Sequence, residues 1–321
     1  MAGMSPQTAP PPIRPPRLDS LPHMASPWPI DPAAGRRRQA GDPSWPRLEL
    51  APLRRAAARA AARIGVPTLV FFSLVALAAG ISAVLLLGWP GSSGRTFSWA
   101  LRPEPAAALI GGCYLVSTFV FGLGCARPWT EVRAICVAVY GLVLPSMVEP
   151  FLHLHVFDFS RWQALLWVAL FVAAPPAITY VHWSQRATPI APGAPLVGWT
   201  RAVLIGSAAV FAVAAIALLV APTRDAISDH APFALVGLTG SYLGAWCSFA
   251  AVLCGWTAWR NSRTEARLAL PTLAAVAAGG VVAALRTLDD IAQAGTYLSV
   301  LAGLVVLYAA CWAVNARRTA G

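Results

Sequence analysis

Eight long apolar segments follow one another along the chain from Val66 onward, with short polar stretches between them. A helix needs roughly 20 apolar residues to cross the hydrocarbon core of a bilayer. Helices are favoured because each then satisfies its own backbone groups in lipid. The pattern predicts an all-α membrane protein with eight transmembrane helices. The predicted spans are Val66–Gly88, Ala106–Cys125, Ala134–Val148, Ala164–His182, Ala202–Ala221, Phe233–Ala258, Leu268–Leu285 and Thr296–Val314.

The composition agrees with a protein that lies in a membrane. Hydrophobic residues make up 57% of the chain and charged residues only 12%, whereas a soluble domain carries about 25% charge. The lipid bilayer is therefore the first expected partner. No charged residue lies near the middle of a predicted span, which disfavours a proton pump or a carrier of charged substrates.

The basic residues are distributed unevenly between the two sides of the membrane. All 24 of them are Arg, and they gather near the two termini and in alternate loops. Because positively charged loops stay in the cytoplasm, both termini are expected to be cytoplasmic. The net charge of +11 reflects this bias, and no nucleic-acid recognition motif accompanies it, so nucleic acid is not an expected partner.

The chain before the first span divides into two parts. Residues 1–51 are rich in Pro and lack apolar periodicity, which predicts a disordered cytoplasmic tail. Residues 52–63 are rich in Ala and Arg and predict a juxtamembrane helix. Its Arg side chains could bind anionic lipids of the inner leaflet, although a simple topological anchor explains them equally well. These residues are Arg54, Arg55, Arg59 and Arg63.

Short motifs recur in the two halves of the chain. Gly112-Cys113-Tyr114-Leu115 matches Gly240-Ser241-Tyr242-Leu243, and Thr130-Glu131-Val132-Arg133 matches Thr264-Glu265-Ala266-Arg267. Thr is expected to cap the helix that follows it. The matches predict two four-span repeats, residues 64–185 and 186–318. Four is an even number of spans, so the repeats would be related by a parallel pseudo-twofold axis along the membrane normal.

A resemblance to known proteins rests on three stretches of the first half. They are Leu152-His153-Leu154-His155-Val156-Phe157-Asp158-Phe159, Ala174-Pro175-Pro176 and Thr130-Glu131-Val132-Arg133. Together they resemble a group of uncharacterised multi-pass membrane proteins of actinobacteria. The resemblance implies a location in the cytoplasmic membrane of a bacterium, and it brings no activity with it.

The favoured function is permease-like transport of a neutral or apolar solute, with the site between the two repeats. Tyr114, Thr239, Ser241 and Tyr242 are the expected ligand-binding residues. Pro175-Pro176 should break or kink the fourth span, because Pro removes a backbone hydrogen bond, and broken helices can frame transporter sites. The alternative is a non-catalytic membrane component that packs against a partner protein and forms a closed bundle without a cavity.

A metal-dependent enzyme at the outer face is the second alternative. Imidazole and carboxylate groups in the outer loops could bind a divalent ion, and these groups are His153, His155, Asp158 and His230. Their spacing matches no established metal motif, and solvated loops explain them as well. The chain also lacks nucleotide-binding and serine-hydrolase motifs. A non-enzymatic protein without a cofactor is therefore the preferred expectation.

Overall fold

The computed structural model describes residues 64–153, 157–188, 190, 193–220, 226, 231–235 and 237–317. All of them belong to one compact unit, Arg54–Gly321. The predicted tail and juxtamembrane helix, with Arg54, Arg55, Arg59 and Arg63, lie outside the described residues. His155 and His230 do so as well.

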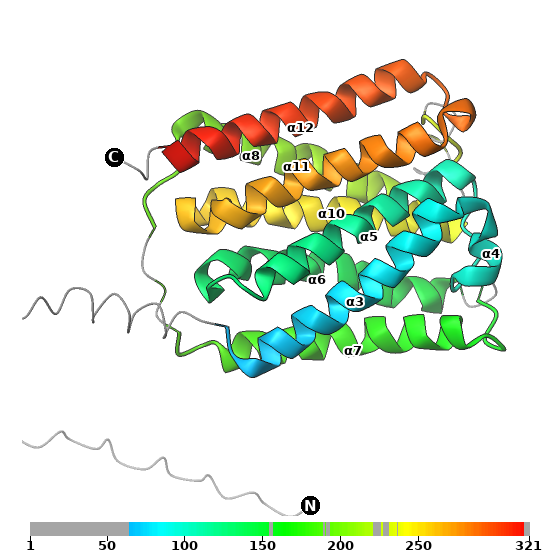
Figure 1. The fold of residues 1–321 in the computed structure, drawn as a ribbon, viewed down its shortest axis with the longest axis horizontal. Helices are drawn as coiled ribbons and strands as arrows, with labels where there is room; N and C mark the ends of the chain where they lie inside the picture. The colour runs from blue at the N-terminus through cyan, green and yellow to red at the C-terminus, as the bar shows by residue number, and fades with distance from the viewer. Residues whose placement is uncertain are drawn as a thin grey trace, which may run out of the picture. The chain divides into compact units, whose positions relative to one another are not determined.

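Eight helices of the described chain are long and apolar enough to cross a membrane, which confirms the predicted class and number of spans. Each predicted span falls on one of them (Figure 1). They are α3 (Val66–Gly88), α5 (Glu104–Gly124), α6 (Trp129–Leu152), α7 (Trp162–Ser184), α8 (Gly198–Leu219), α10 (Gly237–Arg260), α11 (Arg263–Arg286) and α12 (Ala294–Arg317). Short helices lie in two of the connections: η2 (Pro90–Ser92) with α4 (Ser93–Thr96), and η4 (Leu288–Asp290).

Thr130 and Thr264 were expected to cap the helices that follow them, and this expectation is wrong. Thr130 does not cap α6, because the helix begins at Trp129 and its capping residue is Pro128. Likewise, α11 begins at Arg263, so Thr264 lies inside it. Pro175-Pro176 was expected to break or kink the fourth span. The pair does not break it, since α7 continues through both residues to Ser184, and the kink stays a prediction. The two prolines lack the N–H groups that would bond to the carbonyls of Phe171 and Val172. Transmembrane helices tolerate such freed carbonyls when neighbouring groups satisfy them.

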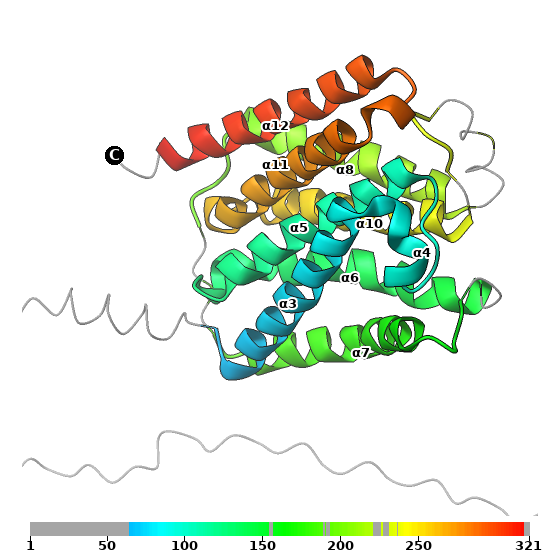
Figure 2. The same ribbon diagram turned by 45° about the vertical axis from the view of Figure 1, so that its right-hand side comes forward.

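The eight helices form a central and a peripheral set. In α5, α6, α10 and α11 more than half of the most apolar window is buried, whereas in α3, α7, α8 and α12 the share is 28% or less. Both views show the peripheral helices on the outside, with α3 and α7 together on one flank and α8 with α12 on the other (Figures 1 and 2). The peripheral helices therefore present the surface that a bilayer would contact.

The described chain begins and ends at the same end of the bundle (Figure 1). We call this the terminal end, since α3 begins there and α12 finishes there, and we call the other the opposite end. At the terminal end Glu131 accepts from Arg127 at 3.5 Å and pairs with Arg267 at 3.6 Å. The buried Glu265 accepts from the Trp256 indole at 2.7 Å and from Arg260 at 3.1 Å. Ion pairs thus hold the central helices together at this end.

Candidate functional site

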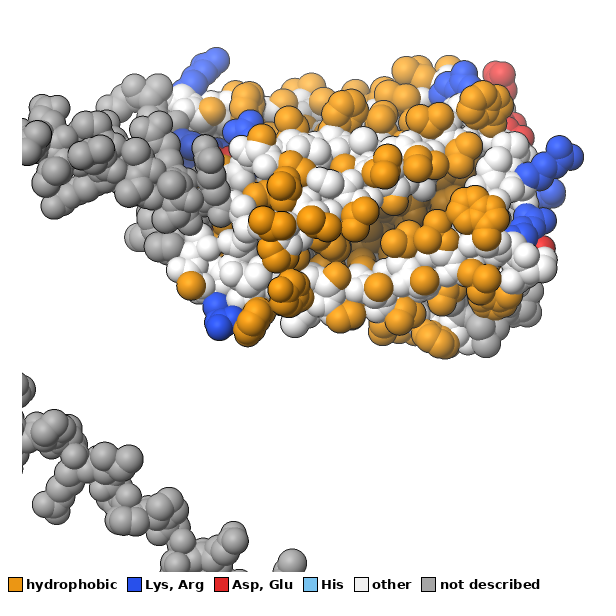
Figure 3. All heavy atoms as spheres, turned by 60° about the horizontal axis from the view of Figure 1, so that its bottom comes forward, with side chains coloured by type: hydrophobic (Ala, Val, Ile, Leu, Met, Phe, Trp, Pro, Cys, Tyr) orange, Lys and Arg blue, Asp and Glu red, His pale blue; other side chains and the backbone are white. Residues whose placement is uncertain are grey.

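A groove of about 310 Å³ lies between α3 and α7, with α5, α6 and α10 behind it. The space-filling view shows a hollow on this flank whose walls are hydrophobic side chains (Figure 3). Its lining includes no charged residue. The lining residues are Phe71, Leu74, Val75, Ala78, Ala79, Ser82, Tyr114, Ser117, Phe121, Val139, Leu142, Val143, Trp167, Leu170, Phe171, Ala173, Ala174, Ala177, Trp246 and Phe249.

Small side chains on the two flanking helices leave the space open. Ala78 and Ala79 line it from α3, and Ala173, Ala174 and Ala177 line it from α7. These helices touch each other only over a short stretch. All of the lining residues on α3 and α7 belong to transmembrane segments. In a bilayer the groove would therefore lie at the depth of the hydrocarbon core and open on the flank that faces lipid.

Near the wall of the groove, two tyrosines meet across the halves of the chain. The hydroxyl oxygens of Tyr114 on α5 and Tyr242 on α10 lie 2.6 Å apart, and either can donate the hydrogen bond. Aromatic rings enclose this pair. Trp167 lies 5.9 Å from Tyr242 between ring centroids, and Trp246 lies 5.9 Å from Tyr114. Trp99 packs edge-on against Tyr242 at 5.7 Å.

The indole groups of Trp167 and Trp246 are the unusual polar atoms of this cluster. Both side chains line the groove and are more than nine-tenths buried. Trp167 faces the Tyr114 hydroxyl and Trp246 faces the Tyr242 hydroxyl, yet neither Nε1 reaches hydrogen-bond geometry with any partner. A buried donor without a full hydrogen bond is costly, so this end of the groove has surplus donor capacity.

The structure distributes the four expected ligand-binding residues differently from the prediction. Tyr114 lines the groove, but Tyr242, Thr239 and Ser241 do not. Tyr242 is completely buried behind Tyr114. The Thr239 hydroxyl accepts from the Trp99 indole at 3.4 Å, and Ser241 is also buried and engaged. The groove lies mainly within the first half of the chain, with α10 as its only contribution from the second half.

Sequence reasoning missed Trp167 and Trp246, although the chain carries a signal for them. Trp in membrane proteins is usually found at the two membrane–water interfaces, near the ends of the spans. Trp167 and Trp246 instead lie several residues inside their helices. A Trp away from the interface must find a buried setting for its N–H, so position within the span could have marked both.

The residues proposed as metal ligands make local pairs where they are described. His153 pairs with Glu149, one turn earlier on α6, at 3.3 Å. Asp158 accepts from Ser160 and pairs with Arg161 at 2.9 Å. The Ser160 hydroxyl, with Arg161 beside it, lowers the pKa of Asp158 below its usual value. Among the described residues no group of three His, Cys, Asp or Glu side chains could hold a metal ion. With His155 and His230 outside this set, the metal site stays a prediction.

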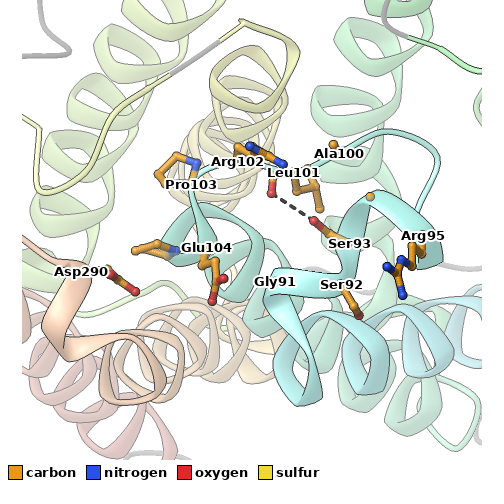
Figure 4. Close-up of a pocket in the computed structure, with 12 residues that line it drawn as sticks. Gly91, Ser92, Ser93, Arg95, Ala100, Leu101, Arg102, Pro103, Glu104 and Asp290 are labelled. Carbon is orange, nitrogen blue, oxygen red and sulfur yellow. Dashed lines mark hydrogen bonds between the residues drawn. The ribbon is translucent and has the colours of Figure 1, made fainter.

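A second, polar cavity of about 970 Å³ lies at the opposite end of the bundle. Figure 4 shows Arg95 and Arg102 on the connection between α3 and α5, with Glu104 and Asp290 nearer the ends of their helices. The Ser93 hydroxyl donates to the Leu101 carbonyl at 3.0 Å and closes the connecting loop. Charges of both signs in an open basin are typical of a solvated surface, so this cavity is a weaker candidate than the groove.

The comparisons with known proteins identify no relative. No protein-family model, no curated protein and no solved structure matches the chain. The resemblance to actinobacterial membrane proteins therefore stays a prediction, and the geometry of the groove has to support the functional conclusion without a relative. What the structure supports directly is an all-helical protein with eight helices suited to span a membrane.

Proposed function

We propose that this protein binds an apolar solute that enters the α3–α7 groove sideways from the bilayer, as a permease-like membrane protein would. The groove is the observation that carries the proposal. Its volume of about 310 Å³ lies at the lower end of the range for small-molecule sites. Two of its walls come from α3 and α7, whose outer faces are suited to lipid. A closed scaffold would not need such a space.

An uncharged solute fits the lining best. Moving an unpaired charged group into the hydrocarbon region costs at least about 2.5–3.5 kcal/mol of free energy. The groove offers no side chain that could pair with it. Aromatic and aliphatic walls instead suit a hydrocarbon chain or ring.

The proposal includes an internal duplication, which contacts in the two halves support. In the first half the Gln185 amide donates to the Thr68 hydroxyl at 3.1 Å. In the second half the Asn315 amide donates to the Thr200 hydroxyl at 2.9 Å. Each bond joins the first helix of a half to the end of its fourth, and the matching Thr residues are 132 positions apart (Thr68 to Thr200).

A close helix contact repeats with nearly the same offset. A Cβ on Gly111 would lie 2.9 Å from the Cβ of Leu86, and one on Gly244 would lie 2.9 Å from that of Leu218. Gly111 and Gly244 are 133 positions apart. The Gly-x-Tyr-Leu match has an offset of 128 (Gly112 to Gly240) and is therefore about one helical turn out of register. With the offset of 132 residues that relates Thr68 to Thr200, Tyr114 corresponds to Trp246.

We also propose that the terminal end faces the cytoplasm. Arg127, Arg133, Arg260 and Arg267 all lie near that end, on α6, on α10 and α11, or in the loop before α6, and positively charged segments stay inside. Acidic residues such as Glu104, Asp158 and Asp290 lie at the opposite end. The bilayer remains the proposed partner, while binding of anionic lipids by Arg54, Arg55, Arg59 and Arg63 and a possible protein partner stay predictions.

Quenching of Trp fluorescence tests whether the groove takes an apolar solute. The probe is 9,10-dibromo-octadecane, added to the full-length protein in dodecyl maltoside, because bromine quenches indoles at contact range. We expect a saturable loss of emission from Trp167 and Trp246. The double variant Ala78→Leu/Ala174→Leu fills the groove and should abolish the saturable part.

The matched control is Ala302→Leu/Ala309→Leu, which adds the same side chains to exposed positions of α12. It should behave like the wild type. Equal quenching in the groove-filled and control variants would overturn the proposal, since bromine would then reach the indoles only through the detergent.

A further inference from the structure

We infer that the groove selects apolar molecules that carry an uncharged hydrogen-bond acceptor, such as an ester or ketone carbonyl, and holds that acceptor at the Tyr114 hydroxyl. The inference rests on the proposed function, because it names the class of solute that the groove would take. Its basis is the imbalance between donors and acceptors at one place on the groove wall.

Four polar groups meet there, and each brings one donor hydrogen. They are the hydroxyls of Tyr114 and Tyr242 and the indole N–H groups of Trp167 and Trp246. Indole nitrogen donates only, whereas a hydroxyl both donates and accepts. Of these groups only the two hydroxyls bond to each other, at 2.6 Å. Each indole N–H faces one of the two hydroxyl oxygens without reaching full hydrogen-bond geometry. The hydroxyl hydrogen that the pair does not use is therefore left over for an acceptor that the described protein groups do not supply.

Tyr114 is the group that a solute could reach. Its side chain is partly buried and lines the groove, whereas Tyr242 is fully buried behind it. A carbonyl oxygen at Tyr114 would accept the free hydroxyl hydrogen if Tyr242 donates within the pair.

The other polar groups of the groove do not change this balance. The Ser82 hydroxyl donates to the Ala78 carbonyl at 3.0 Å, and the Ser117 hydroxyl donates to the Cys113 carbonyl at 3.1 Å. Their hydrogens are thus used within their own helices, and neither bonds to the tyrosine pair. No Arg, His, Asp or Glu lines the groove, so a carboxylate would find no partner there. The acceptor must be neutral.

The test compares two brominated probes that differ in one polar group. Methyl 9,10-dibromostearate carries an ester carbonyl, and 9,10-dibromo-octadecane does not. We expect the ester to bind about threefold to tenfold more tightly in the saturable quenching assay, since it gains one neutral hydrogen bond that the alkane cannot make. Dodecyl maltoside is suitable because it has no carbonyl that would compete.

Tyr114→Phe should remove the preference for the ester while both probes still bind. Its matched control is Tyr308→Phe, which deletes a hydroxyl that donates to Ser207 at 2.9 Å away from the groove and should keep the preference. The probe ratio in the wild type is informative even if Tyr114→Phe fails to fold. Equal affinities of the two probes would overturn the inference and leave the groove intact. If neither probe shows saturable binding to the wild type, the proposed function itself is overturned.

Discussion

At the scale of single residues, glycine sets how closely the two halves approach. Gly112 on α5 faces Gly279 on α11, where a Cβ on Gly112 would collide with the Gly279 carbonyl and one on Gly279 would lie 2.8 Å from the Gly112 carbonyl. Without side chains the two backbones can touch, as small residues allow in membrane helix pairs. Gly122, on the same helix, has no atom within 4 Å of its Cβ position.

We therefore expect Gly112→Ala to lower the free energy of unfolding by about 1–3 kcal/mol, because the added methyl forces the helices apart. Gly122→Ala should be neutral or stabilising by about 0.5–1 kcal/mol, since Ala is the better helix former. Unfolding in mixed micelles, followed by circular dichroism, measures both. Equal effects of the two substitutions would contradict the close α5–α11 contact.

The sequence was informative about residue types and less so about which residues meet. The tyrosine of each Gly-x-Tyr-Leu motif could be singled out, and the two hydroxyls do bond. That Tyr242 is buried while Tyr114 lines the groove depends on how helices α5 and α10 are rotated. Rotation is set by packing against neighbours, and almost uniformly apolar spans carry little periodicity to reveal it.

At the scale of helices, one buried side-chain hydrogen bond joins α3 to the end of α7, and another joins α8 to α12, both near the terminal end. Thr68 and Thr200 are completely buried, and Gln185 and Asn315 are 5% exposed. Polar side chains in such positions hydrogen-bond across helices. In the first half this bond and a short contact are what join α3 to α7, because the groove separates them over much of their length.

We expect Thr68→Val to destabilise the protein by about 1–3 kcal/mol, because it leaves the buried Gln185 amide without this acceptor. Adding Gln185→Leu should recover part of the loss, since both polar partners are then removed. The parallel cycle with Thr200→Val and Asn315→Leu should show coupling of the same sign. Asn315→Leu alone should cost more, because the Asn315 side chain also accepts from the Val197 N–H at 3.1 Å. Additive losses in either cycle, measured as free energies of unfolding, would show that the pair does not interact.

Helix boundaries could be predicted where a long apolar segment gives way to a charged or polar loop. All eight spans could be placed because hydrophobic length alone defines them. The third span was predicted too short, as Ala134–Val148, because α6 continues through Glu131 and Arg133. Those charges are accommodated by Arg267 and by the ring of Trp256, which lies 5.2 Å from the Arg133 guanidinium. Such partners are distant in sequence and cannot be read from the local pattern.

At the scale of the whole molecule, two exposed alanines in connecting loops offer a matched test of orientation. Ala100 lies at the opposite end, and Ala126 lies at the terminal end. If the terminal end faces the cytoplasm, a membrane-impermeant maleimide added to intact cells should label Ala100→Cys and leave Ala126→Cys unlabelled until the cells are opened. The reverse pattern would invert the proposed topology.

The groove itself could not be foreseen from the sequence. Hydropathy predicted that the helices cross a membrane but not that α3 and α7 would leave a space between them. The alanines that keep it open are common in membrane helices and usually serve close packing. Only the packing of the five surrounding helices shows that here they line a cavity.

Native mass spectrometry of the full-length protein, extracted gently from its own membranes, tests most directly whether the groove holds a solute. We expect the wild type and Ala302→Leu/Ala309→Leu to retain one stoichiometric, uncharged apolar adduct that Ala78→Leu/Ala174→Leu has lost. A wild type without an adduct, or an adduct that the groove-filled variant keeps, would contradict binding in the α3–α7 groove.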